Sequence, residues 1–155
     1  MSNHPGMTAL IKLVFLVAGM CVAALAPAAD TIGQIKIVNG SVTVERVGQV
    51  EAAKNGTPVR ELDTVRTGPK SSAGITFADN TMMSLGPDSV LYLDRFVFNP
   101  TTHEGRFNSV MRKGTLSVIS GKIAKQSPDA VSVQTPTAML GVRGTEFFVQ
   151  VDTPR

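Results

Sequence analysis

Reactive and aromatic side chains are scarce in this 155-residue sequence, which has one cysteine, no tryptophan, one tyrosine and two histidines. Cys21 lies inside an apolar N-terminal run, so the rest of the chain has no disulfide, no thiolate nucleophile and no cysteine metal site. His103 is the one histidine outside the first 28 residues. A lone histidine in a polar loop disfavours a zinc site or a Ser-His-Asp triad. We expect a solvated loop histidine and neither metal nor cofactor.

Charge of one sign is also scarce. The formal net charge is +3, and Lys12 in the N-terminal segment contributes to it. The remaining cations are scattered and do not alternate with aromatic residues, so platforms for stacking bases are missing. These features exclude nucleic acid as a partner.

The first 28 residues differ from the rest of the chain. Residues 13–25 form a continuous apolar run, and Ala26-Pro27-Ala28 places small residues where a signal peptidase reads them. The run is shorter than the roughly 20 residues of a transmembrane helix. We therefore interpret residues 1–28 as a signal peptide cleaved after Ala28, with an uncleaved anchor as the alternative. Residues 29–155 form one domain, expected in the periplasm or secreted.

Short runs of alternating apolar residues with turn signals between them fill this domain. The pattern predicts an all-β fold of about ten short strands, arranged as a sandwich, a roll or a short solenoid. Asn39-Gly40 is typical of a hairpin turn. Residues 106–111 and 114–119 are predicted to form another hairpin, joined across 112–114. Residues 122–130 are interpreted as a surface connection.

Two pairs of large apolar residues interrupt the polar positions of the predicted strands. They are Met82-Met83 and the alternating Phe96 and Phe98. Alternation directs only one of each pair inward, so the other remains near the surface. A protein contact at these positions is one interpretation.

Two motifs near the C-terminus closely resemble the end of the FecR domain, a periplasmic module best known from iron-uptake signalling. They are Thr135-Pro136-Thr-Ala138 and Val142-Arg143-Gly144-Thr145-Glu146-Phe147. Further motifs of that domain follow one another in the family's order. They are Leu62-Asp63-Thr-Val-Arg-Thr-Gly68, Phe77-Ala-Asp79-Asn80, Leu85-Gly-Pro87-Asp-Ser89 and Gly114-Thr-Leu116-Ser-Val118.

The chain also departs from the family pattern. Leu62 and Asn80 stand where glycine is usual. FecR sigma-factor regulators carry a cytoplasmic segment, a membrane helix and a further periplasmic domain, whereas this sequence has a leader and stops at Arg155. The resemblance therefore implies the domain, and we do not expect the sigma-factor role to carry over.

The candidate site residues come from these motifs. Arg143 is interpreted as part of a structural hydrogen-bond network, with a partner-binding role as the alternative, because a buried guanidinium needs a partner. The same interpretation applies to the other residues of the two C-terminal motifs, which are Thr135, Pro136, Val142, Gly144, Thr145, Glu146 and Phe147. The residues assigned to turns are Asp63, Asp79 and Pro87. We interpret Gly141 and Gly144 as residues that the backbone conformation requires, and not as a phosphate-binding site.

The functional hypothesis is a non-enzymatic, signalling-associated binding or scaffold module for an envelope protein or a cell-wall polymer. No catalytic residue is expected. One alternative is a secreted glycan hydrolase using two of Asp63, Asp79, Asp88 and Asp94. Another is a structural subunit that assembles by strand addition.

Overall fold

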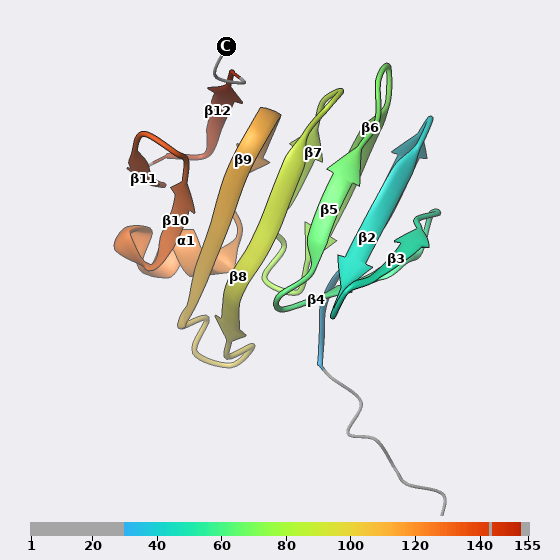
Figure 1. Cartoon of the computed structure of the whole chain (residues 1–155). Helices are drawn as coiled ribbons and strands as arrows, with labels where there is room; N and C mark the ends of the chain where they lie inside the picture. The colour runs from blue at the N-terminus through green and yellow to red at the C-terminus, as the bar shows by residue number, and fades with distance from the viewer. Residues whose placement is uncertain (1–29, 143, 153–155) are drawn as a thin grey trace, which may run out of the picture.

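A computed structural model of the chain describes residues 30–142 and 144–152. These residues form twelve β-strands, one short α-helix and one 3-10 turn. The strands belong to one curled sheet that folds back on itself (Figure 1). The all-β prediction is confirmed, and the architecture is a roll.

The longest strand, β9 (Gly105–Ile119), joins the two halves of the roll. Half A has the order β4–β1–β6–β7–β9–β12, and half B has the order β3–β2–β5–β8–β9–β10–β11. The neighbours in half A are antiparallel, and in half B only β9 and β10 run parallel.

The other strands of half A are β1 (Thr31–Asn39), β4 (Pro58–Arg60), β6 (Ser72–Phe77), β7 (Met82–Leu85) and β12 (Glu146–Val151). The other strands of half B are β2 (Val42–Arg46), β3 (Gln49–Ala52), β5 (Thr64–Thr67), β8 (Val90–Phe98), β10 (Val131–Gln134) and β11 (Met139–Gly141).

The predicted hairpin within residues 106–119 is wrong, because these residues lie in the single strand β9. Gly114 adopts a φ of 90°, which favours glycine, and it lies where β9 passes from half B to half A. At Asn39-Gly40 the chain bends, and Gly40 has a φ of 73°. That bend connects β1 in half A to β2 in half B, however, so the two strands are not paired as the predicted hairpin.

The core lies between the two halves. Alternate residues of each strand point inward, and three phenylalanines meet there because β6 faces the paired strands β8 and β9 across the roll. The ring of Phe107 lies 4.6 Å from that of Phe77 and 5.1 Å from that of Phe96, both edge-on. Each such buried side chain contributes about 1.5–3 kcal/mol through the hydrophobic effect.

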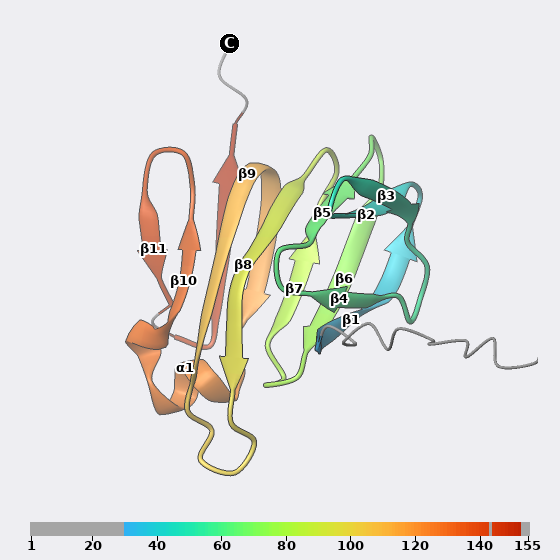
Figure 2. The same ribbon diagram turned by 60° about the horizontal axis from the view of Figure 1, so that its bottom comes forward.

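The segment after β9 is more than a surface connection. It contains helix α1 (Lys122–Gln126) and the 3-10 turn η1 (Pro128–Ala130). Ile123 and Ala124 are buried, so the helix closes the end of the roll beside the start of β9 (Figure 2). Within the described ranges, no helix is both long and apolar enough to span a membrane.

Candidate functional site

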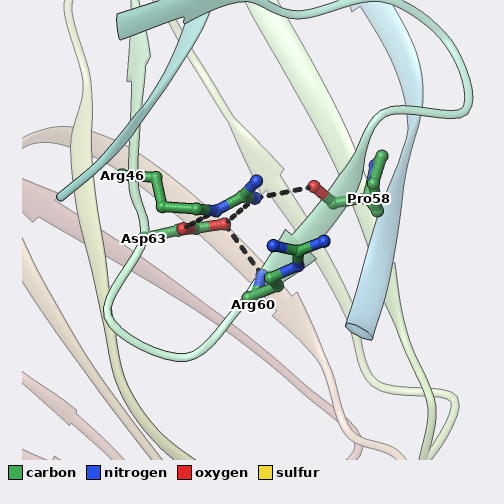
Figure 3. Close-up of polar contacts among 4 residues, drawn as sticks. All are labelled: Arg46, Pro58, Arg60 and Asp63. Atoms are coloured by element: carbon green, nitrogen blue, oxygen red, sulfur yellow. Dashed lines mark hydrogen bonds and ion pairs between the residues drawn. The ribbon is translucent and has the colours of Figure 1, made fainter. Parts of the chain in front are cut away.

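Asp63 lies at the turn between β4 and β5 and is fully buried. Its carboxylate accepts two hydrogen bonds from the Arg46 guanidinium, from Nε at 2.8 Å and from Nη2 at 2.7 Å. It also accepts the backbone N–H of Arg60 at 2.8 Å (Figure 3). The hydrogen bond to Asp63 raises the pKa of Arg46. Because a forked ion pair and a backbone amide occupy the carboxylate, Asp63 anchors this turn to β2.

Asp79 is equally buried, but its donors are neutral. One oxygen accepts the Thr81 N–H at 3.0 Å, and the other accepts the Thr81 hydroxyl at 2.7 Å and the Ile123 N–H at 3.4 Å. Its backbone carbonyl accepts the Lys122 N–H at 2.7 Å. The N-cap residue of α1 is Gly121, which has no side chain to cap the helix. Asp79 therefore caps that helix from a distant turn.

Pro87 lies exposed in the turn between β7 and β8. The neighbouring Ser89 is buried, and its hydroxyl accepts the Thr115 N–H at 3.0 Å and donates to the Thr115 carbonyl at 3.2 Å. This motif fixes the turn next to the bend of β9.

The C-terminal motif surrounds β11 and the start of β12. Thr135 closes the β10–β11 turn, because its N–H and hydroxyl both donate to the Ala138 carbonyl, at 2.7 and 3.1 Å. Pro136 is exposed in that turn, and Val142 is buried. Arg143 lies outside the described residues, so its predicted role stays a prediction.

The second part of the motif attaches β12 to β9. Ser120 donates its backbone N–H to the Thr145 carbonyl at 2.9 Å and its hydroxyl to the Gly144 carbonyl at 2.7 Å. Glu146 and Phe147 begin β12, with Glu146 exposed and Phe147 partly buried. The motif residues that the structure describes thus position the last strand.

The hydrolase candidates differ in their surroundings. Asp79 is buried by its hydrogen bonds, whereas Asp94 is exposed at a bulge of β8. His103 is partly buried and stacks on Phe98. The described part of the chain brings no three His, Cys, Asp or Glu side chains together in a metal-binding cluster.

A hollow of about 530 Å³ opens beside the start of β1 and the end of β8. Phe96, Phe98 and Ile32 give it an apolar wall, and Asp30 contributes a carboxylate. A neighbouring hollow contains Glu61, whose carboxylate accepts the Phe96 N–H at 2.6 Å. One oxygen of that acid therefore holds strand β8 in place.

The outer surface of half A is the most distinctive feature of the molecule. Cross-strand pairing places five residues in one row, in the order Ile37, Gly74, Ser84, Ser117 and Phe148. Met82 and Ile119 are paired in the adjacent row. We call these seven residues the flat face. Small residues form its centre, and its four large apolar side chains are 40–65% exposed.

Sequence reasoning predicted that one residue of each apolar pair stays near the surface. This is confirmed for the methionines, because Met82 is 44% exposed and Met83 is 1% exposed. It is wrong for the phenylalanines, because Phe96 and Phe98 are two residues apart and share one face of β8, so Phe96 is buried and Phe98 is partly buried against the core. Sequence reasoning missed Arg46 as the partner of Asp63, although the alternation of Val42, Val44 and Arg46 places the arginine on the inward side of its strand. It also missed the flat face as a whole, because the periodicity of one strand does not identify its neighbours.

These features define an all-β module whose buried acids are used for its own structure. A family model described as "FecR protein" matches residues 63–155, more than half of the chain. The chain therefore belongs to the FecR family, a signalling-related family. Among solved structures, a chain described as "Cell surface anchoring domain" is 40% identical, with a TM-score of 0.38. The match covers 39% of this chain and 82% of that chain. The comparison with curated proteins gives no match.

Proposed function

We propose that this protein is a non-enzymatic, signalling-associated module of the cell envelope that binds another envelope protein through the flat face. The observation that carries the proposal is that four exposed apolar side chains share one sheet surface with small residues between them. Ile37 and Phe148 lie at the two ends of one row, and Met82 lies beside Ile119 in the next. Exposed apolar surface of this kind marks contact sites when it is contiguous. Membership of the FecR family supports a role in signalling or in the envelope.

A protein fits this surface better than a cell-wall polymer does. The seven residues of the flat face include no charged residue and no aromatic residue other than Phe148 at one end, and the exposed Glu146 borders them as the cross-strand partner of Ile119. Glycan chains bind by stacking the C–H faces of their rings on aromatic side chains and by hydrogen bonds from their hydroxyls, and the flat face offers one aromatic ring and few polar groups. An apolar patch on a partner protein would remove the exposed apolar side chains from water, at about 25 cal/mol per Å² of apolar surface.

Site-specific photo-crosslinking in living cells tests this function. A photoreactive phenylalanine analogue replaces Met82 or Ile119 in the full chain, and the control places it at Glu51, which is exposed on β3 of half B. We expect one discrete adduct with an envelope protein from Met82 and Ile119 and none from Glu51. Adducts from Glu51 alone, or co-sedimentation with peptidoglycan without any protein adduct, would contradict the proposal.

Export is part of the proposed function, and it depends on the leader in residues 1–28. The small residues of Ala26-Pro27-Ala28 support cleavage after Ala28. N-terminal sequencing of the protein from the envelope fraction should therefore begin at Ala29. A chain that keeps its first residues and stays with the membrane would favour the anchor instead.

A further inference from the structure

The edges of half A differ in how they are protected against pairing. One edge is β4, which has three residues and begins with Pro58, a residue without a backbone N–H. The other edge is β12, whose six residues pair with β9 in unbroken register from Glu146 to Val151. Among the described residues, β12 has no second neighbour. It carries neither proline nor bulge, and Glu146 is its one charged residue.

The hydrogen-bond pattern shows which backbone groups face this free edge. Ser120 donates to the Thr145 carbonyl, so Thr145 and Ser120 form a hydrogen-bonded pair. Along an antiparallel ladder, hydrogen-bonded pairs alternate with non-hydrogen-bonded pairs, whose N–H and C=O groups point away from the partner strand. The N–H and C=O groups of Glu146, Phe148 and Gln150 therefore point outward from β9. An added strand would have to bond to these three residues.

The sequence of β12 is self-complementary about Phe148. In an antiparallel copy centred there, Phe148 faces Phe148, Phe147 faces Val149, and Glu146 faces Gln150. The residues that expose their backbone groups thus meet one another, as the hydrogen-bond pattern requires. The aromatic pair extends the outer surface, and the pair of Phe147 and Val149 extends the inner one.

We propose that a second copy of this chain occupies the edge, and that the two β12 strands pair antiparallel, centred on Phe148. The two half-A sheets then form one continuous sheet across a two-fold axis. Each copy contributes one β12, so the assembly closes as a dimer. The proposal does not depend on the proposed function, because it rests on the backbone edge of β12, although Phe148 at its centre also belongs to the flat face.

Other registers satisfy the edge less well. A shift of one residue would pair outward side chains with inward ones. A shift of two residues in one direction places Glu146 opposite Asp152, and like charges directly opposite are unfavourable. A shift of two in the other direction leaves only residues 146–148 paired within the strand. The register centred on Phe148 combines the long overlap with a neutral partner for Glu146.

Charge variants test both the dimer and its register. The protein is purified from cells expressing the full chain, and its dissociation constant is measured by sedimentation from about 1 μM to about 1 mM. Gln150→Glu places two carboxylate pairs opposite one another and should weaken the dimer about three- to tenfold. The double variant Glu146→Gln with Gln150→Glu restores neutral pairing and should recover the original constant. Circular dichroism checks that both variants are folded.

Cysteine cross-linking gives an independent measurement in a Cys21→Ala background. Phe148→Cys brings two sulfurs to facing positions, whose Cα atoms lie about 5.5 Å apart in a hydrogen-bonded pair, within disulfide range. It should form a covalent dimer on oxidation. The matched control is Ile37→Cys, at an exposed position on β1, which should stay monomeric.

Several results would overturn the proposal. One is a monomer throughout the concentration range, which would leave the edge to a segment of another protein. Others are species larger than a dimer, a Gln150→Glu variant as tight as the original, or a double variant that is not restored. Equal cross-linking by the Ile37→Cys control would also overturn it.

Discussion

Asp63, in the turn that leads from half A to half B, and Asp79, in a turn within half A, are compensated differently. Both are fully buried turn residues, and each adjoins a residue with a φ of 67°, Leu62 before Asp63 and Asn80 after Asp79. Asp63 faces the charged guanidinium of Arg46, whereas Asp79 accepts only neutral donors. Two acids that look alike in sequence thus have different structural roles.

The difference shows what each acid holds together. The ion pair of Asp63 connects the β4–β5 turn to β2, 17 residues away in the chain. Asp79 connects a turn of half A to helix α1, 44 residues away. A buried carboxylate needs compensation because its desolvation is costly. Removing the compensation should therefore be more harmful at Asp63, where a full charge supplies it.

Arg46→Met should cause the largest loss of stability. It leaves the buried Asp63 carboxylate with the Arg60 N–H alone, and breaking a buried pair in this way costs about 3–5 kcal/mol. Urea denaturation measures the free energy of unfolding. The matched control, Arg46→Lys, keeps the charge but cannot form the forked pair, so its loss should be smaller. Equal losses for the two variants would show that charge does not decide stability at this turn.

Asp79→Ala should cause the next largest loss. It removes the acceptor of the Thr81 N–H, the Thr81 hydroxyl and the Ile123 N–H, which costs about 2–3 kcal/mol when buried donors lose their partner. Hydrogen exchange should accelerate at the Ile123 amide. Asp94→Ala, at an exposed position, should change stability by less than about 0.5 kcal/mol. An Asp79 variant as stable as the Asp94 variant would contradict the capping role.

Local sequence predicted the strand content and both turns. Alternation identified most strands, the turn composition placed Asp79 correctly, and the family motif placed Asp63 in its turn. It failed at β9, because Arg112-Lys113-Gly114 has the composition of a turn. In the structure, Gly114 bends the strand while pairing continues on both sides of it. A glycine at positive φ can end a strand or redirect it, and only the neighbouring strands decide which.

The partners of the two acids could not be predicted from local patterns. Arg46 and Ile123 meet Asp63 and Asp79 through the curl of the sheet, across long stretches of chain. The flat face has the same origin, since Gly74, Ser84 and Ser117 become neighbours only through strand pairing. The order of strands in a sheet depends on contacts between distant segments, and the apolar pattern of a single strand does not show which strands will be its neighbours.

The smallest expected effect distinguishes Leu62 from Asn80, the two residues with positive φ that adjoin the buried acids. A side chain with a Cβ in this left-handed conformation costs about 1–2 kcal/mol, and glycine avoids that cost at an entropic penalty of about 0.5–1 kcal/mol. Leu62→Gly should therefore stabilise the protein by about 0.5–1 kcal/mol, since the leucine side chain is 62% exposed and packs little. Asn80→Gly should change little, because asparagine tolerates this conformation.

Leu62→Ala is the control that separates backbone strain from the exposed leucine surface. Alanine keeps the Cβ, so it retains the strain but removes the rest of the side chain. If strain is the cause, the free energy of unfolding in urea should rise for the glycine variant and stay nearly constant for the alanine variant. Equal gains for both would assign the effect to the exposed side chain. The turn before Asp63 would then resemble the turn after Asp79 in its tolerance of a side chain at positive φ.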